Sequence, residues 1–284
     1  GGAPSRRLPD GLSVPTRRKP VSHVPMTRPA EALAVHETRY AHDSSFVRLR
    51  DGRLLHAAGG QFSASADGGL PWSADHTCVD AAGGPVGSSG TSLVRLPGGG
   101  IGIAGMRRER DAASPEEASR SNHLVFWRSP DDGQTWEAPV RITPPGLPTH
   151  AYQDVLLCTS SGRLVLPVYA ALGQGLGPDG RTPPACGKLV ANQWVSTAAH
   201  FFDPRFTLVY VCYSDDEGRS RQRNRDGELM ILRDWGTSFS YVNEPSVAEV
   251  VPKRLLMLMR TGLGRLFQAW SDDDGTTWSR PQPT

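Results

Sequence analysis

Short apolar runs separated by tight turns dominate the chain from residue 43 onward. Four segments share one layout, in which an apolar run, a turn such as "RDG" or "SSG" and a second apolar run follow one another. They begin at Asp43, Gly90, Gln153 and Glu244 and read "DSSFVRLRDGRLLHAAG", "GTSLVRLPGGGIGIAGM", "QDVLLCTSSGRLVLPVY" and "EPSVAEVVPKRLLMLMR". Such runs, bounded by turn residues, are typical of β-strands, and no segment has a convincing helical period. The pattern predicts an all-β protein built from repeated hairpins.

A second repeat follows each of these hairpins. It reads "SADGGLPW" (Ser65–Trp72), "SPDDGQTW" (Ser129–Trp136), "SDDEGRSR" (Ser214–Arg221) and "SDDDGTTW" (Ser271–Trp278). Asp accepts backbone N–H bonds in tight turns and Gly supplies positive φ, so the repeat predicts a turn with the Trp folded over it. The alternative, a calcium loop of the EF-hand type, needs alternating ligands and a Glu at the twelfth position between helices, and that pattern is absent. We therefore expect structural turns and no metal site.

The two repeats together predict a β-propeller. Each unit has four antiparallel strands, with the tight turn between strands 1 and 2 and the Asp turn between strands 3 and 4, as in a propeller blade. The start of strand 1 and the end of strand 2 then lie at one end of the blade, and the Asp turn lies at the other. Ligand sites of closed β architectures lie at the mouth, so the start of strand 1 is where we expect one.

Composition and charge limit the classes of protein and of partner that fit this chain. The 284 residues include 31 Gly and 24 Pro, which favours many turns, and the net charge of +2 does not indicate a nucleic-acid or membrane partner. No apolar run is long enough to cross a membrane, and the opening "GGAPSRR" is not a signal peptide, so localisation is undefined. The four Cys lack metal-type spacing, so free thiols are expected and a disulfide stays open. Residues 1–35 predict an irregular N-terminal arm, and residues 36–284 the propeller.

Polar side chains collect at the predicted mouth. They include two carboxylates, a His, two Tyr and two Arg. The set is His42, Asp43, Tyr152, Gln153, Tyr169, Glu244, Arg107 and Arg260. Polar strand ends are common in any β-protein, yet carboxylates facing guanidinium groups at one mouth indicate a site for a polar ligand such as a sugar.

The Asp boxes and the stretch "NEPSVAEVVPKRLLMLMR" resemble the sialidase superfamily of Asp-box (BNR) propellers. The resemblance covers roughly residues 40–284. It implies a six-bladed propeller, of which we count four blades here, so the propeller is expected to be incomplete at the C-terminus. It also implies hydrolysis of glycosides of a carboxylate-bearing sugar, with a triad of Arg around the carboxylate and a Tyr nucleophile activated by a Glu. By resemblance, Glu244 is that Glu and Arg260 is the second Arg of the triad.

The sequence departs from the family pattern at two places. The stretch "HDSSF" lacks the Arg of the "RIP"-type motif, and "HAAGGQFSASADGG" leaves almost no room for the acid/base Asp. The third Arg and the Tyr would lie beyond residue 284. Asp43 and His42 are our hypothesis for substitute catalytic proton donors, from the blade alignment alone.

Three functions fit these residues. The favoured one is an exo-acting glycoside hydrolase that cleaves a terminal, acidic sugar from a glycan substrate without a cofactor. The second is a propeller polysaccharide lyase, in which His42 or His150 with Tyr152 and Arg260 would act on a uronate. The third is a non-catalytic carbohydrate-binding propeller. The sequence does not define the sugar, the linkage or the oligomeric state.

Overall fold

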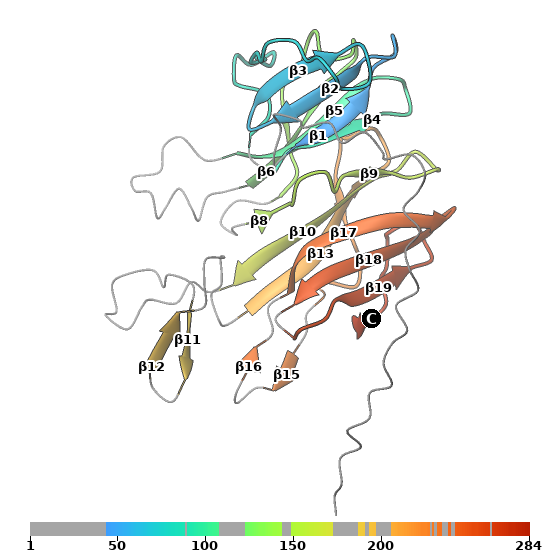
Figure 1. The fold of residues 1–284 in the computed structure, drawn as a ribbon. Coiled ribbons are helices and arrows are strands. Elements are labelled where there is room, and N and C mark those ends of the chain that lie inside the picture. The colour runs from blue at the N-terminus through green and yellow to red at the C-terminus, as the bar shows by residue number, and fades with distance from the viewer. Residues whose placement is uncertain are drawn as a thin grey trace, which may run out of the picture. The chain divides into compact units, whose positions relative to one another are not determined.

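The computed structural model describes residues 44–88, 90–107, 123–143, 149–172, 187–190, 193–196, 206–227, 229, 232–234, 238–239, 242–261 and 263–284. Contacts divide the chain into Gly1–Glu37 and Thr38–Thr284, and the predicted N-terminal arm lies outside the described residues. Within these ranges the regular elements are all β-strands, as Figure 1 shows. No helix found there has the length and apolar character to traverse a bilayer. The all-β prediction is therefore confirmed.

Four antiparallel sheets carry the repeat, and their strands follow chain order from one edge to the other. The first sheet is β1 (Ser45–Arg48), β2 (Leu54–Ala58) and β3 (Gln61–Ser65), and the second is β4 (Ser92–Arg95), β5 (Ile101–Arg107), β6 (His123–Ser129) and β7 (Val140–Arg141). The third is β8 (Thr149–His150), β9 (Leu157–Cys158), β10 (Leu164–Leu172), β13 (Phe206–Ser214) and β14 (Gln222–Arg223). The fourth is β17 (Val242–Val251), β18 (Arg254–Thr261), β19 (Phe267–Ser271) and β20 (Gln282–Pro283). Two small hairpins complete the strands: β11 (Gly187–Val190) with β12 (Gln193–Ser196), and β15 (Leu232–Asp234) with β16 (Ser238–Phe239).

The four predicted hairpins are present, with one correction in the third sheet. Its innermost strand is split into β8 and β9, which both pair with β10, and Gln153 lies in the turn between them. Asp154 in that turn has a φ of 56°, donates its backbone N–H to the Thr91 carbonyl and accepts a hydrogen bond from the Ser45 hydroxyl at 2.7 Å. These bonds to the first and second sheets hold the chain in a turn where the apolar pattern predicts a continuous strand.

Three apolar clusters fill the spaces between the four sheets. Each cluster combines residues of two consecutive sheets, so the sheets pack face to face in chain order. Representative fully buried members are Ile103 and Trp127 between the first and second sheets, Tyr210 and Leu124 between the second and third, and Met257 and Met259 between the third and fourth. Cys78, Cys158 and Cys212 are free thiols, and Cys186 lies outside the described residues. This stack of antiparallel sheets is the blade arrangement that the repeats predict.

The four Asp boxes share one hydrogen-bond pattern. In the fourth box the Ser271 hydroxyl donates to the Asp273 carboxylate at 2.8 Å and accepts the Gly275 N–H at 2.8 Å, while Asp273 also accepts the Thr277 N–H. Ser65, Ser129 and Ser214 form the same two bonds in the other boxes, at 2.7 to 2.9 Å. The Asp carboxylates are thus engaged by the turn itself, which agrees with the interpretation of the boxes as scaffold.

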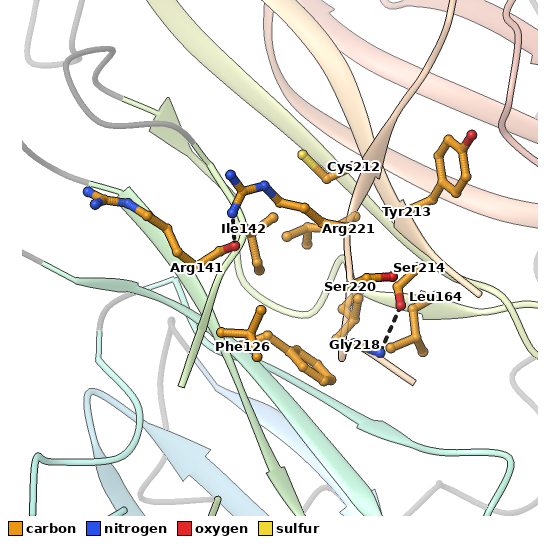
Figure 2. Close-up of a pocket in the computed structure, with 13 residues that line it drawn as sticks. Phe126, Arg141, Ile142, Leu164, Cys212, Tyr213, Ser214, Gly218, Ser220 and Arg221 are labelled. Carbon is orange, nitrogen blue, oxygen red and sulfur yellow. Dashed lines mark hydrogen bonds between the residues drawn. The ribbon is translucent and has the colours of Figure 1, made fainter. Parts of the chain in front are cut away.

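The Trp of the second and fourth boxes folds back as predicted. Trp136 and Trp278 are buried, and each indole N–H donates to the carbonyl of its box Gly at 3.1 Å. The third box has Arg221 at this position. There the Phe126 ring of the preceding sheet packs on Gly218, and a small cavity opens beside it (Figure 2). The cavity has a volume of about 30 Å³ and mostly apolar walls, which include Ile142 and Leu166.

A further position of the box joins consecutive sheets. The residue directly before the box Gly has positive φ in the second, third and fourth boxes, at 57° to 61°, and is always acidic. Its carboxylate reaches the turn between strands 1 and 2 of the preceding sheet. Asp132 accepts the Arg50 N–H, Glu217 accepts the Gly98 N–H, and Asp274 accepts the Ser161 hydroxyl. We call these three side chains the latch residues. The first box has Gly68 at this position and so has no such side chain.

The latch residues also receive charged or hydroxyl partners. Arg95 donates to Asp132 at 2.5 Å, and Arg128 donates to Glu217 at 3.1 Å. Partial burial acts to raise the pKa of Asp132, but the hydrogen bonds from Arg95 and Arg50 lower it below its ordinary value. The Asp132 carboxylate is therefore held in its ionised form and contributes to stability at neutral pH.

The latch makes a prediction for stability. Asp132→Ala removes the acceptor of the Arg50 N–H and the partner of Arg95, so we expect the free energy of unfolding to fall by about 1–3 kcal/mol. Asp132→Asn, which tolerates positive φ, should lose less. Urea unfolding measures both, with Asp272→Ala as the matched control, because the Asp272 side chain is 78% exposed. Equal losses of stability for Asp132→Ala and Asp272→Ala would contradict the stabilising role of the latch residue Asp132.

The cavity beside Arg221 makes a second prediction. Arg221→Trp restores the residue found in the other boxes and places apolar atoms against the cavity, so we expect a gain of about 0.5–2 kcal/mol in the free energy of unfolding. Arg221→Ala should show no gain, because it adds no atoms to the cavity. Thermal unfolding of the two variants beside the wild type tests this, and a Trp variant that is less stable than the Ala variant would count against it.

Candidate active site

The strand registers place the predicted mouth residues at the end of each sheet away from the Asp boxes. In the fourth sheet Arg260 pairs with Asn243 at one end, whereas Leu255 pairs with the box residue Ser271 at the other. In the third sheet Tyr169 of β10 pairs with His150, and Leu164 at the opposite end of that strand pairs with the box residue Ser214. The end opposite the boxes therefore carries Glu244, Arg260 and Tyr169, as the blade geometry predicts.

Glu244 and Arg260 form an ion pair at this end. The guanidinium Nη1 of Arg260 donates to both carboxylate oxygens of Glu244, at 2.8 and 3.0 Å. The two residues lie on adjacent strands, and a register shift between Asn243 and Ser246 places Glu244 in a β-bulge. The Glu244 side chain is 20% exposed and that of Arg260 is 42% exposed, so both are accessible to a ligand. Bulges commonly direct a side chain into a functional site.

The backbone of Glu244 is strained. Its φ is 45°, in the left-handed region that residues other than Gly, Asn and Asp rarely occupy. The aligned residue of the second sheet is Gly90, with a φ of 69°, so these two sheets share positive φ at this position, whereas the aligned Gln153 of the third sheet does not have it. A Glu here costs about 1–3 kcal/mol and is consistent with a functional requirement for the carboxylate.

Tyr169 joins this pair from the neighbouring sheet. It is 9% exposed and packs in the apolar cluster between the third and fourth sheets. Burial raises the pKa of Tyr169 to about 12, with further contributions in the same direction from Glu244 and Tyr152 and an opposing one from Arg260. The phenol therefore lies within electrostatic reach of these three side chains and stays protonated at neutral pH.

His150 lies behind Tyr169. The two residues form a cross-strand pair between β8 and β10, and their rings stack with centroids 5.5 Å apart and planes inclined by 25°. Burial lowers the pKa of His150 from its ordinary value of 6.5, so the imidazole is neutral at neutral pH. Four predicted mouth residues, Tyr152, Tyr169, Glu244 and Arg260, are thus brought together, and His150 is added to them.

The remaining predicted residues have other positions. Arg107 ends β5 of the second sheet opposite His123, and its Nη2 and an oxygen of Asp80 both lie within 3.3 Å of the point that a Cβ on Gly84 would occupy. The described contacts do not join Arg107 to the ion pair, because its guanidinium turns toward this loop. Gln153 lies in the turn after β8, and His42 and Asp43 lie outside the described residues.

Two features were not predicted from the sequence. One is the positive φ of Glu244, which the alignment with Gly90 could have indicated. The other is Asn243, which is 1% exposed and whose side-chain oxygen has no hydrogen-bond partner among the described residues. Across the described ranges no group of three His, Cys, Asp or Glu side chains is arranged to hold a metal ion.

The strain at Glu244 makes a stability prediction. Glu244→Gly relieves the positive φ, whereas Glu244→Ala keeps the strain and loses the same ion pair. We therefore expect the Gly variant to be more stable than the Ala variant by about 1 kcal/mol, and at least as stable as the wild type, since a partly exposed ion pair contributes little. Urea unfolding of the three proteins measures this. An Ala variant as stable as the Gly variant would show that Glu244 is not strained.

Comparisons with known proteins agree with this fold. Solved structures with similar folds include a Hadza microbial sialidase (18% identity, TM-score 0.54, 84% of this chain and 46% of that one). A protein of unknown function from Dyadobacter fermentans matches with 18% identity and a TM-score of 0.57, over 85% of this chain and 68% of that one. The NanB sialidase from Streptococcus pneumoniae matches with 12% identity and a TM-score of 0.51, over 86% and 52%. This chain thus spans about half the length of the two sialidases.

The sequence comparisons define the family. No curated protein matches the chain. The model of the BNR repeat-like domain matches residues 111–284, which is more than half of the chain and includes the second, third and fourth Asp boxes and the Glu244–Arg260 pair. With its stacked antiparallel sheets and four Asp boxes, the chain belongs to the BNR repeat-like family and has the β-propeller fold of the sialidase superfamily.

Proposed function

We propose that this chain contributes the Glu244–Arg260 part of the active site of an exo-acting glycosidase, which cleaves a terminal, acidic sugar from a glycan. The observation that carries the proposal is the Glu244–Arg260 pair itself. A carboxylate held in a strained backbone conformation faces a partly exposed guanidinium, at the strand ends away from the scaffold boxes. Strain of this kind is kept where function needs the side chain.

Each residue of the pair has a role in this proposal. Arg260 binds the carboxylate of the sugar, because a guanidinium offers several N–H donors in one plane. Glu244 takes the proton of a nucleophilic Tyr, as the resemblance to sialidases implies. Tyr169 is unsuited to be that nucleophile, because burial and the neighbouring carboxylate raise its pKa to about 12. We assign Tyr169 and Tyr152 to the wall of the sugar site, with Gln153 at its edge.

The proton donor of the reaction is not among the described contacts. Asp43 and His42 remain our sequence-based candidates, since they precede β1 in the aligned units. Arg107 remains a prediction of the sequence alone as a substrate-binding residue, because its guanidinium lies beside Asp80. The names of two structural relatives, both sialidases, support a glycoside as the substrate class.

Activity on glycosides tests this proposal. Because the resemblance implies a nucleophilic Tyr beyond residue 284, the panel is run on the full-length gene product, which we expect to release chromophore from at least one chromogenic glycoside in a set that includes a sialoside and uronides. Glu244→Gln should lower kcat by about 100-fold or more, because it removes the base while it keeps the shape of the side chain. Arg260→Lys should raise KM more than it lowers kcat, because a point charge replaces planar recognition. Glu137→Gln is the matched control, since that carboxylate is half exposed and pairs with Arg128.

The same panel separates the alternatives. Turnover with the absorbance of an unsaturated uronate would indicate a lyase and contradict hydrolysis. Binding of a glycan without turnover, unchanged in Glu244→Gln, would indicate a carbohydrate-binding propeller. Turnover that survives Glu244→Gln would show that the reaction takes place elsewhere.

A further inference from the structure

The stacked pair of His150 and Tyr169 gives the candidate site an element that is not part of its ion pair. Cross-strand partners project from the same face of a sheet, so β8 and β10 hold the imidazole and the phenol ring together. The planes are inclined by only 25°, which is close to parallel stacking. β8 is two residues long, so the ring contact adds to the pairing of only two residues, Thr149 and His150, with β10.

Tyr169 connects His150 to the ion pair. It belongs to the apolar cluster that includes Val242 and Met259 of the fourth sheet, and its hydroxyl lies in the field of Glu244 and Arg260. His150 stacks on the same ring from β8. A shift of His150 would therefore be transmitted to Glu244 and Arg260 through Tyr169.

We propose that His150 is a positioning residue of the candidate site: the neutral imidazole holds the Tyr169 ring beside the Glu244–Arg260 pair, and protonation of the imidazole releases it. The inference deepens the proposed function, on which its activity readout rests. Its consequence is that substrate binding weakens in acid, through Tyr169, before the carboxylate chemistry of the site is lost.

The surroundings of His150 determine the direction of this effect. The titratable and charged groups nearest the stack are Tyr169 on β10, Tyr152 on the following turn, and Glu244 with Arg260 on the fourth sheet. β6 also contacts β8 and contributes His123, which is buried. Burial alone accounts for the lowered pKa of His150, so protonation is opposed by loss of water. An imidazolium gains some attraction to a phenol ring, yet it regains full hydration only by moving away from it.

The sign of the pH dependence follows. A His whose folded pKa is lowered is neutral in the fold and protonates in the unfolded chain as the pH falls through 6.5. Stability and an ordered Tyr169 are therefore fully present above pH 6.5. The stability contribution declines as the pH falls below 6.5, and Tyr169 is released as the pH falls through the lower pKa that His150 has in the fold.

Kinetics on the glycoside that the wild type turns over give the first test. We expect kcat/KM to fall as the pH drops below 6.5, with the fall mainly in KM. His150→Phe keeps a stacked ring that cannot be protonated, so it should keep the activity at neutral pH and lack this fall. His150→Ala should raise KM at all pH values, by about 10-fold or more, because the Tyr169 ring loses its support. His76→Gln is the control, since His76 lies in the first sheet next to Phe62.

A second readout needs no activity. NMR of the 284-residue chain follows the His150 and Tyr169 ring signals with pH, and His150→Phe identifies the imidazole signal. We expect both rings to change together, with one midpoint below 6.5. A Tyr169 signal that stays constant while His150 titrates would overturn the inference, even for a protein that cleaves no glycoside. An acidic fall in kcat/KM that persists unchanged in His150→Phe would also overturn it.

Absence of turnover by the wild type contradicts the proposed function instead. The two failures are thus distinguishable, because the NMR titration decides on the stack and the glycoside panel decides on the enzyme.

Discussion

The hydrogen bonds of the Asp box are the constraint on which the rest of the structure depends. A Ser hydroxyl that donates to the box Asp and accepts the box Gly N–H closes the turn in all four boxes. The closed turn forces the residue before Gly into positive φ in the second, third and fourth boxes, and this conformation directs its acidic side chain toward the preceding sheet. A local turn thereby fixes how one sheet meets the next.

The two ends of each sheet therefore have different roles. Boxes and latch residues hold the sheets at one end, so residues at the other end can depart from the most stable choice. Gly90 and Glu244 share positive φ at aligned positions, and Glu244 adopts it at a cost in strain that Gly90 does not have. Tolerance of the strain is explained by the latch and the apolar clusters, which over-determine the position of the strand around it.

The sequence predicted the hairpins and the boxes because both depend on short-range signals. Alternating apolar runs and turn residues define β17 and β18 well, and register then brings Arg260 opposite Asn243. The split strand before β10 was not predictable, because hydrogen bonds from Asp154 to Thr91 and from Ser45 to Asp154 join residues of different sheets. The orientation of the Arg107 guanidinium was not predictable for the same reason, since it lies beside Asp80 in a loop that the strand pattern does not define. The stacking of His150 on Tyr169 likewise required the pairing of β8 with β10.

The partial exposure of the ion pair bears on the binding role that we propose for the Arg260 guanidinium. A fully buried pair would be costly to separate, whereas a pair as exposed as Glu244 and Arg260 contributes little net stability. In the proposed site, a ligand carboxylate would share or replace the Glu244 contact of Arg260 at small cost, and Glu244 would then accept a proton. Tyr169 stays protonated beside them, so it adds no competing negative charge to the site. An exposed ion pair is expected to contribute less to the fold than the backbone strain of Glu244 costs, and this imbalance is the physical argument for the binding role that we propose for the pair.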